Sequence, residues 1–288
     1  MKRSILKLIL ILVPLGLIAS GISIFLSAHS LTVSRYEVTT PLLTDTVRIV
    51  QLTDLHNSEF GEHNQRLVQK VAEQAPDLIA ITGDLLNSNV QRLDIAQELI
   101  AQLAALAPVY VSYGNHEIMY QDAYGTDLRA LYSASGATVL EYEWAELCVK
   151  GQSIRLGGIY GYCMPAHYLD IGGADEAECA FLSAFQDTEA YTVLLCHMPY
   201  SWIVHDSLEA WEIDCVLCGH VHGGQIRFPF LGGLWAPDQG WFPGRESGLY
   251  RSEDGSRVML LSRGLGNTDR LPRMNNLPEI LVLNLLPA

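Results

Sequence analysis

Residues 47–57 read VRIVQLTDLHN, an apolar run that ends in the polar residues Asp54 and His56. Short runs rich in Val, Ile and Leu are typical of strands that are buried on both faces. The next apolar run, 77–82, is followed in a similar way by Asp84. In open α/β sheets, ligands bind at the carboxyl ends of the strands. This stretch therefore predicts both an α/β fold and the sheet edge at which a site forms.

The same two patterns alternate along the rest of the chain. Apolar residues at helical spacing predict helices at 64–74, 90–106, 175–186 and 201–210. Short apolar runs predict strands at 108–113, 137–142, 145–150, 153–160, 191–196, 214–218, 257–262 and 279–284. No internal repeat or low-complexity linker separates them. Residues 36–288 are therefore predicted to form one α/β domain with buried sheets.

The composition limits the classes of protein to which this chain can belong. Hydrophobic residues make up 49% of the 288 residues and charged residues 17%, a balance that disfavours disorder and coiled coil. Acidic residues outnumber Lys and Arg by 32 to 18, and the formal net charge is −14. Proteins that coat nucleic acid are basic, so no nucleic-acid binding is expected.

Residues 1–35 differ from the rest of the chain in charge and hydropathy. They contain Lys and Arg but no acidic residue, and residues 8–28 are nearly all Leu, Ile, Val, Gly and Ala. At about 1.5 Å per residue, a helix over 8–28 is about 31 Å long, enough to cross a bilayer core. We therefore predict that residues 1–35 form a short cytoplasmic stub and a single-pass membrane anchor.

Charges at the ends of this segment predict its orientation. Lys2, Arg3 and Lys7 precede the apolar stretch, so the positive-inside rule puts the N-terminus in the cytoplasm and the domain outside it. Arg35 at the other end opposes this orientation modestly. A cleaved signal peptide is the alternative, but Leu26 is a poor −3 residue for its best cleavage site.

The six cysteines are even in number, as a disulfide framework outside the cytoplasm requires. Cys196 and Cys215 nevertheless fall in predicted central strands. Cys215 and Cys218 are three residues apart, which turns them to opposite faces of a strand and disfavours a shared metal ion. We therefore predict buried structural thiols.

Residues that can bind metal follow five of the predicted strands. They are Asp54 and His56, then Asp84, then Asn115 with His116, then His197, and finally His220 with His222. Asp54 and His56 are two residues apart, so both can face one ion, and the two histidines after residue 219 repeat this spacing. Carboxylate and imidazole ligands suit Zn, Mn or Fe rather than Ca.

Each of these motifs alone has an ordinary structural explanation. Asp-x-His is a weak signal, Gly-Asp and Gly-Asn-His are common in turns, and a buried histidine is usually just hydrogen-bonded. Their recurrence after five of the predicted strands is what favours a metal site.

The order of these motifs resembles the calcineurin-like metallophosphoesterase superfamily. The series is Asp54-x-His56, Gly83-Asp84, Gly114-Asn115-His116-Glu117, His197 and Gly219-His220-x-His222. The longer stretches 53–57 and 220–225 resemble the membrane-anchored bacterial branch of that superfamily. The resemblance covers roughly residues 36–286 in motif order.

This resemblance implies a four-layer α/β/β/α sandwich with a site for two divalent metal ions. One ion would take Asp54, His56, Asp84 and His222, and the other Asp84, Asn115, His197 and His220. Asp84 would thus bridge the two ions. His116 would bind no metal and would act as a general acid or charge stabiliser near the leaving group. The implied activity is hydrolysis of a phosphodiester by attack of a metal-activated water.

One motif departs from the pattern of many members, which read Gly-Asp-x-x-Asp-Arg. Here the residues are Gly83-Asp84-Leu85-Leu86-Asn87-Ser88, so Asn87 replaces the second acid and the arginine is missing. In protein phosphatases of the superfamily, that acid orients the catalytic histidine and that arginine holds phosphate. The departure argues against a phosphoprotein phosphatase and leaves the partner of His116 unidentified.

The C-terminal quarter of the chain carries the clues to the substrate. Residues 226–246 read IRFPFLGGLWAPDQGWFPGRE, an aromatic loop directly after a metal motif. Such a loop either faces the membrane as a lipid-gripping lip or packs its aromatic residues on the domain's own core. Arginine suits phosphate. The candidates for substrate contact are Asn115, Arg227, Arg245, Arg263, Arg270 and Arg273.

Together these features predict a membrane-anchored phosphodiesterase with two metal ions. One form of this prediction has a lipid-linked phosphodiester as the substrate. The alternative with the same chemistry is a pyrophosphatase of the UDP-diacylglucosamine type, acting on a lipid-linked nucleotide sugar. An alternative of another class is a non-enzymatic, metal-stabilised binding module of the cell envelope. The sequence predicts neither the identity of the metal nor the oligomeric state.

Overall fold

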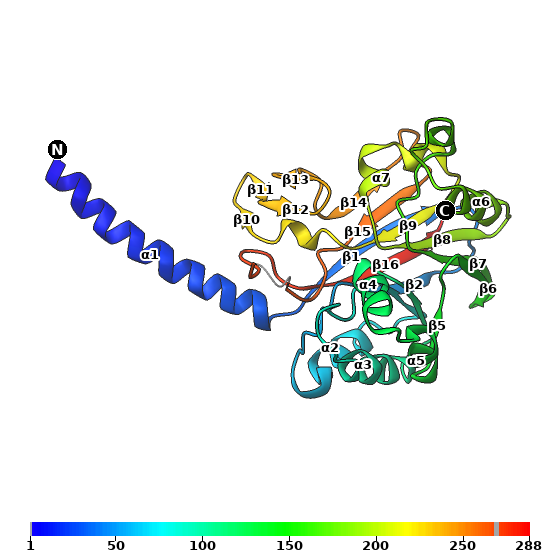
Figure 1. The fold of residues 1–288 in the computed structure, drawn as a ribbon, viewed down its shortest axis with the longest axis horizontal. Helices are drawn as coiled ribbons and strands as arrows, with labels where there is room; N and C mark the ends of the chain where they lie inside the picture. The colour runs from blue at the N-terminus through cyan, green and yellow to red at the C-terminus, as the bar shows by residue number, and fades with distance from the viewer. Residues whose placement is uncertain (1, 268–270) are drawn as a thin grey trace.

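The computed structural model describes residues 2–267 and 271–288 and contains two six-stranded sheets (Figure 1). The first sheet has the order β1-β16-β2-β3-β4-β5 and the second the order β14-β15-β9-β8-β7-β6. The first consists of β1 (Thr32–Thr40), β2 (Val47–Leu52), β3 (Leu78–Thr82), β4 (Val109–Ser112), β5 (Ala137–Val139) and β16 (Glu279–Pro287). The second consists of β6 (Glu143–Val149), β7 (Gln152–Ile159), β8 (Tyr191–Cys196), β9 (Cys215–Cys218), β14 (Gly248–Arg251) and β15 (Val258–Leu261).

Alternate residues of the central strands pack against different layers. In β3, Leu78 and Ala80 lie in the core between the two sheets, whereas Ile79 and Ile81 lie under helices. β8 follows the same alternation in the second sheet. Because both faces of these strands are buried, they are apolar at successive positions, as the sequence pattern predicts.

Helices cover the outer face of each sheet. The first sheet is covered by α2 (Gln65–Ala72), α3 (Asp94–Ala104) and α5 (Leu128–Ala134), and the second by α6 (Glu176–Gln186), α7 (Tyr200–Val204) and α8 (Ser207–Ala210). The layers are therefore helix, sheet, sheet and helix. The predicted four-layer sandwich is confirmed.

Local structure differs from the sequence prediction between residues 90 and 134. α3 begins at Asp94 rather than at residue 90, and neither α4 (Asn115–Tyr124) nor α5 has a counterpart among the predicted elements. α4 has few apolar residues on its buried face, so it lacks the stripe that identifies a helix in a sequence. Its start is determined instead by Glu117, whose carboxylate accepts a hydrogen bond from the Gly114 N–H at 2.9 Å.

Two other boundaries are set by the backbone and by distant pairing. The predicted helix at 201–210 is divided into α7 and α8, because Asp206 has a left-handed φ of 55°. β1 pairs in parallel with β16 from Thr32 onward, so this strand crosses the boundary predicted at residue 35. Its partner lies about 250 residues away along the chain, beyond the reach of any local pattern.

α1 (Lys2–His29) projects from the domain as one long helix (Figure 1). Its segment Leu10–His29 has a mean hydropathy of 2.3 and is long and apolar enough to be a candidate membrane span. The Ser23 hydroxyl donates to Oδ1 of Asn275 at 2.8 Å and accepts from the N–H of the same residue at 2.7 Å. α1 is thus attached to the loop that precedes β16.

Residues 226–246, here called the aromatic lobe, form two small hairpins beside the sandwich. The hairpins pair β10 (Arg227–Phe228) with β11 (Gly232–Gly233) and β12 (Trp235–Ala236) with β13 (Gly240–Trp241). All five aromatic side chains of the lobe are exposed. Phe230, Trp241 and Phe242 are more than half exposed and so favour the first interpretation of this loop, whereas Phe228 and Trp235 are more than half covered.

Candidate metal centre

The predicted ligands lie together at one edge of the two facing sheets. Asp54 and His56 follow β2, Asp84 follows β3, Asn115 and His116 begin α4 after β4, His197 follows β8, and His220 and His222 follow β9. β2, β3 and β4 run parallel to one another, as do β8 and β9. Their carboxyl ends therefore deliver these side chains to one place.

The backbone bends sharply where the ligands are attached. The φ angles of Asp54, His56, Asp84, His220 and His222 are all positive, between 48° and 72°. L-residues rarely adopt this conformation, which costs about 1–3 kcal/mol per residue and persists only where surrounding contacts hold it. The N–H groups of Asp54 and His56 donate to the carbonyls of Gly83 and Asp84 at 3.0 Å. These contacts join the loops after β2 and β3 into one rigid unit.

Two glycines allow the loops to approach the carboxylates closely. A Cβ at Gly114 would lie 2.2 Å from Oδ1 of Asp84, and a Cβ at Gly219 would lie 2.7 Å from Oδ2 of Asp54. Any larger residue at either position would displace a carboxylate from the cluster.

Three groups of side chains bring candidate ligand atoms within 4.8 Å of one another. They are Asp54 with His56 and His222, Asp84 with His197 and His220, and His56 with Asp84 and His116. Oδ2 of Asp84 lies 3.2 Å from Nε2 of His197 and 3.6 Å from Nε2 of His56. One carboxylate oxygen therefore reaches both halves of the cluster.

Burial and the carboxylates set the charge of the histidines. Burial lowers the pKa of His56 and of His222, so both rings are neutral at pH 7 and can act as ligands. Burial also opposes a charge on His197, but the Asp84 carboxylate outweighs it and raises the pKa of His197 to about 10. A bound cation would take the place of the proton on His197 as the positive partner of the Asp84 carboxylate.

Hydrogen bonds at the far nitrogens orient two of the candidate ligands. Nδ1 of His56 donates to Oδ1 of Asn87 at 2.9 Å, and Nδ1 of His197 donates to the Thr82 carbonyl at 2.7 Å. Both contacts assign the N–H to Nδ1 and direct Nε2 toward the centre. Asn87, which departs from the family pattern, thus orients His56 rather than His116.

His116 is oriented by a backbone group. Its ring Nδ1 accepts a hydrogen bond from the Ser88 N–H at 3.0 Å. The backbone N–H of His116 donates to Oδ1 of Asp84 at 2.9 Å. A backbone amide can only donate, so the neutral ring carries its proton on Nε2. The partner that the sequence left unidentified is therefore the amide that follows Asn87.

Two polar atoms of the cluster are buried without a hydrogen bond, namely Nε2 of His197 and Oδ1 of Asn115. The Asp84 carboxylate lies 3.2 Å from the first of them but not in hydrogen-bonding geometry. Buried polar atoms are nearly always paired. Both atoms are of types that bind divalent cations, and both belong to the set implied for one of the two ions. The donor set therefore fits a metal.

Glu117 joins the loops that carry the ligands. Its fully buried carboxylate accepts hydrogen bonds from the N–H groups of Asp84 at 2.7 Å, Leu85 at 2.8 Å and Gly114 at 2.9 Å. Burial raises the pKa of this carboxyl, while the amides of Gly114 and Asp84 oppose the rise. The sequence identified Glu117 only as the end of the Gly-Asn-His-Glu motif and assigned it no role.

The cluster opens onto a pocket of about 370 Å³, here called the metal-side pocket. Besides the metal-binding candidates, its walls are formed by Asn87, Ser88, Asn89, Met119 and Pro237. Among the described residues that line it, none is Lys or Arg. The described walls therefore supply no fixed positive charge to this pocket apart from what a histidine or a bound metal contributes.

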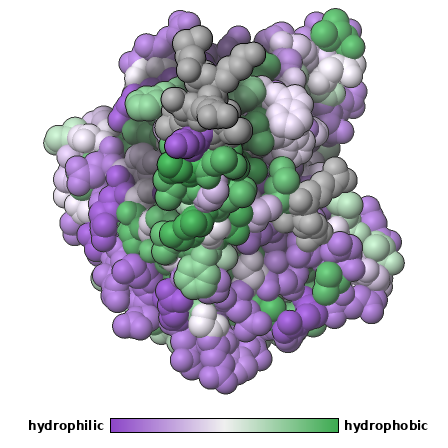
Figure 2. All heavy atoms as spheres, turned by 90° about the vertical axis from the view of Figure 1, so that its left-hand side faces the viewer, coloured by the Kyte–Doolittle hydropathy of each residue, from purple (hydrophilic) through white to green (hydrophobic). Residues whose placement is uncertain are grey.

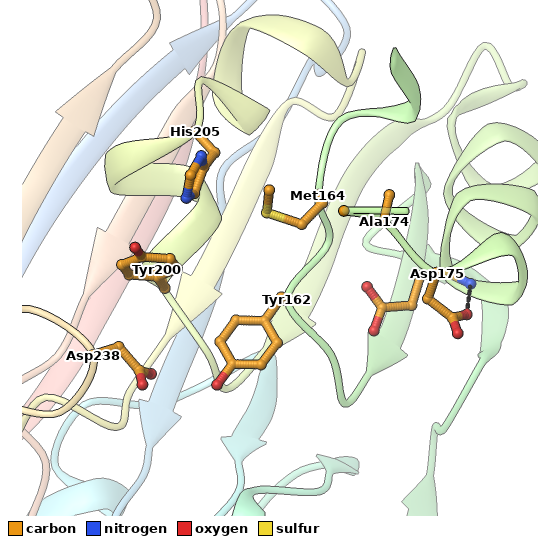
Figure 3. A pocket seen from close by; sticks show the side chains of 9 residues that line it. Tyr162, Met164, Ala174, Asp175, Tyr200, His205 and Asp238 are labelled. Carbon is orange, nitrogen blue, oxygen red and sulfur yellow. Dashed lines mark hydrogen bonds between the residues drawn. The ribbon is translucent and has the colours of Figure 1, made fainter. Parts of the chain in front are cut away.

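A neighbouring pocket of about 460 Å³ is walled in part by Tyr162, Tyr200 and Asp238 (Figure 3). Asp238 belongs to the aromatic lobe, and its carboxylate lies 3.4 Å from Nε2 of His220. Carboxylates in this position commonly orient metal-binding histidines. The lobe thus contacts the candidate ligands directly, through a residue that the sequence did not identify.

Four of the arginines named from the sequence belong to the described residues, and all four lie outside the lining of the metal-side pocket. Arg227 and Arg263 form ion pairs of 3.3 and 3.1 Å with buried glutamates, and Arg245 donates to a backbone carbonyl at 2.9 Å. Arg273 is buried and donates to carbonyls. Arg270 lies outside the described residues. Substrate contact by these arginines stays a prediction, and the geometry of the described ones gives it no support.

The family model for calcineurin-like phosphoesterases matches residues 47–224, which is more than half of the chain and includes every candidate ligand. The chain belongs to the calcineurin-like phosphoesterase family. Members of this family are hydrolases that bind divalent metals. The family predicted from the order of the motifs is confirmed.

Relatives of similar length share most of the chain. The uncharacterized metallophosphoesterase YkuE of Bacillus subtilis (strain 168) is 29% identical over 275 residues, covering 92% of this chain and 89% of YkuE. The phosphodiesterase YaeI of Escherichia coli (strain K12) is 28% identical over 248 residues, covering 83% and 82%. A solved 5′-nucleotidase precursor from Thermus thermophilus is 16% identical, with a TM-score of 0.48 over 76% of this chain and 49% of that one.

Proposed function

We propose that this chain is a phosphodiesterase that uses two divalent metal ions, of Mn, Zn or Fe. The observation that carries the proposal is the position of Asp84 between two groups of candidate ligands, one of which leaves His197 Nε2 and Asn115 Oδ1 buried without a hydrogen bond. Asp54, His56 and His222 would hold one ion with Asp84. Asn115, His197 and His220 would hold the other with Asp84.

The two bound ions would supply Lewis-acid catalysis and lower the pKa of water near the phosphorus atom. The protein contributes a proton at the opposite end of the reaction. His116 lines the pocket and carries its proton on Nε2, because the Ser88 N–H occupies Nδ1. We assign His116 the role of proton donor to the departing oxygen. Glu117 and Asn87 act as positioning residues for the ligand loops.

The walls of the metal-side pocket favour a diester over a monoester. A phosphodiester carries one negative charge, whereas a phosphomonoester carries up to two at neutral pH. Asn87, Ser88 and Asn89 are neutral, and among the described residues no Lys or Arg lines this pocket. The name of the relative YaeI points in the same direction. The alternative pyrophosphatase activity would bring a second charge into a pocket whose described walls offer no cation besides the proposed metal ions, so we rank it lower.

Hydrolysis of bis-p-nitrophenyl phosphate by the full chain tests this proposal. We expect turnover with Mn²⁺, loss of turnover on chelation, and recovery when the metal is returned. The monoester p-nitrophenyl phosphate should be hydrolysed more slowly at equal concentration. Faster hydrolysis of the monoester would contradict the diester assignment. Inactivity with Mn, Zn and Fe alike would favour the non-enzymatic binding module.

We also propose that α1 anchors the chain in the cell membrane, with the domain outside the cytoplasm. The cationic residues Lys2, Arg3 and Lys7 support this orientation. Cys148 offers a test, because it is exposed whereas the other five cysteines are buried. A membrane-impermeant maleimide should label intact cells that express the full chain, and Cys148→Ser should abolish the labelling. Labelling only after lysis would reverse the orientation.

A further inference from the structure

An apolar pocket of about 310 Å³ lies beside the metal-side pocket. Its walls are formed by Val221, His222, Gln225, Trp235, Pro237, Trp241 and Leu271. His222 and Pro237 line both pockets. A molecule seated against Trp235 and Trp241 therefore touches His222, which is also a candidate metal ligand.

The outer surface of the aromatic lobe is unusually apolar for a segment in contact with water. The side chain of Phe230 is fully exposed, and Leu231, Trp241 and Phe242 are 68%, 69% and 54% exposed. Large exposed apolar patches mark sites that bind a protein, a membrane or a ligand. Tryptophan at such a site favours the boundary between lipid and water.

The lobe lies next to the candidate membrane span. Asn275 exchanges two hydrogen bonds with Ser23 of α1, and its side chain donates to the carbonyl of Arg227 in β10 at 3.2 Å. Ser23 is inside the candidate span Leu10–His29, six residues before its end, or about 9 Å along the helix axis. The base of the lobe is therefore level with the last turns of the span.

In Figure 2 the apolar helix α1 projects toward the viewer, and the surface around it is mostly hydrophilic. In Figure 1 the hairpins β10–β13 lie on the side of the sandwich from which α1 projects. If α1 crosses a bilayer, the lobe lies at the surface of that bilayer.

We propose that the pocket between Trp235 and Trp241 binds an acyl chain of a membrane lipid, and that the phosphodiester of that lipid enters the adjacent metal-side pocket. This inference rests on the proposed function and specifies its substrate class. The occupant is a hydrocarbon chain rather than a second polar group, because four of the seven lining residues are Val221, Trp235, Trp241 and Leu271. The anchor α1 and the exposed lobe indicate the bilayer as its source.

A series of p-nitrophenyl phosphodiesters with methyl, butyl and octyl groups tests the pocket with the full chain in lipid nanodiscs and saturating Mn²⁺. Each methylene that enters an apolar pocket strengthens binding by up to about fourfold. The wild type should therefore prefer the octyl over the methyl ester by at least about tenfold in kcat/KM. Trp235→Ala and Trp241→Ala should each bring this ratio toward one.

The chain provides a matched control for these variants. Trp144 on β6 is 38% exposed, as is Trp235, but it does not line the pocket. Trp144→Ala should retain the full preference for the octyl ester. Absence of a preference in the wild type, or a preference unchanged in both lobe variants, would overturn the acyl-chain pocket while leaving the phosphodiesterase proposal intact.

If the wild type hydrolyses none of the esters, the result counts against the proposed phosphodiesterase activity. A binding measurement then tests the acyl-chain pocket separately. Octyl phosphate and inorganic phosphate are then titrated into the same nanodisc samples by calorimetry. Octyl phosphate should bind the wild type at least about tenfold more tightly than inorganic phosphate, and Trp241→Ala should remove that advantage. Equal affinities in the wild type would overturn the pocket.

Discussion

The metal centre and the aromatic lobe meet at His222 and Pro237 but are built in different ways. The ligands are buried, attached to the ends of central strands, and joined by hydrogen bonds to Glu117 and to neighbouring loops. The lobe consists of two-residue strands with exposed aromatic side chains. Reactive groups must be held rigidly, whereas a surface that contacts a soft apolar partner need not be. Substitutions should therefore have very different effects in the two regions.

The largest effect is expected at Asp84, whose carboxylate reaches both groups of ligands. Asp84→Asn should lower kcat/KM for bis-p-nitrophenyl phosphate by at least about 10³-fold, which corresponds to about 4 kcal/mol. Circular dichroism should show a retained fold. Asp122→Asn, the same change at an exposed position of α4, serves as the control. Near wild-type activity of the Asp84 variant would remove the shared carboxylate from the proposal.

His116→Ala should lower kcat by about 10²–10⁴-fold on a diester with an alkyl leaving group. The loss should be much smaller with p-nitrophenolate as the leaving group, because this stable anion departs without taking up a proton. The ratio of the two rates, measured in wild type and variant, separates a proton donor from a structural role. His167→Ala, at an exposed histidine, is the control. An equal loss on both substrates would contradict the assigned role.

Asn87→Ala should weaken the activating metal by about 10–100-fold, because Nδ1 of His56 loses its acceptor. Asn87→Asp keeps an acceptor at this position and should recover most of the affinity. The Mn²⁺ concentration at half-maximal activity and direct calorimetric titration measure the effect. If the alanine variant binds metal as tightly as the wild type, Asn87 does not position His56.

The smallest effect is expected at the tip of the lobe. Phe230 is fully exposed and has a φ of 69°, a conformation that Asn tolerates better than Phe. Phe230→Asn should leave the melting temperature unchanged or raise it by about 1–2 °C. A fall of several degrees would show that the lobe packs on the domain, and the contrast between the two regions would fail.

The candidate site is largely readable from the sequence because its ligands follow strands that are apolar on both faces. In β2, β3, β8 and β9, burial makes nearly every position apolar, so Asp54, Asp84, His197 and His220 stand out among the polar groups at each end. Burial of Cys196, Cys215 and Cys218 is readable for the same reason, whereas the prediction of a buried thiol is wrong for Cys148, which is exposed. α4 is not readable, because its polar sequence is held in a helix by contacts of Glu117 with its own N-cap residue, Gly114, and with the loop after β3.

The sequence by itself determined the fold class, the family and the set of candidate ligands, because these depend on residue types at short spacings. It also determined that the N-terminal stretch is apolar over the length of a bilayer. Only the tertiary structure decided that Ser88 and Asn87 orient different histidines, and that Arg273 is buried. It also decided that β1 pairs with β16 and that α1 and the lobe both hydrogen-bond with Asn275. These contacts join residues far apart in the chain, and no local pattern encodes such distances.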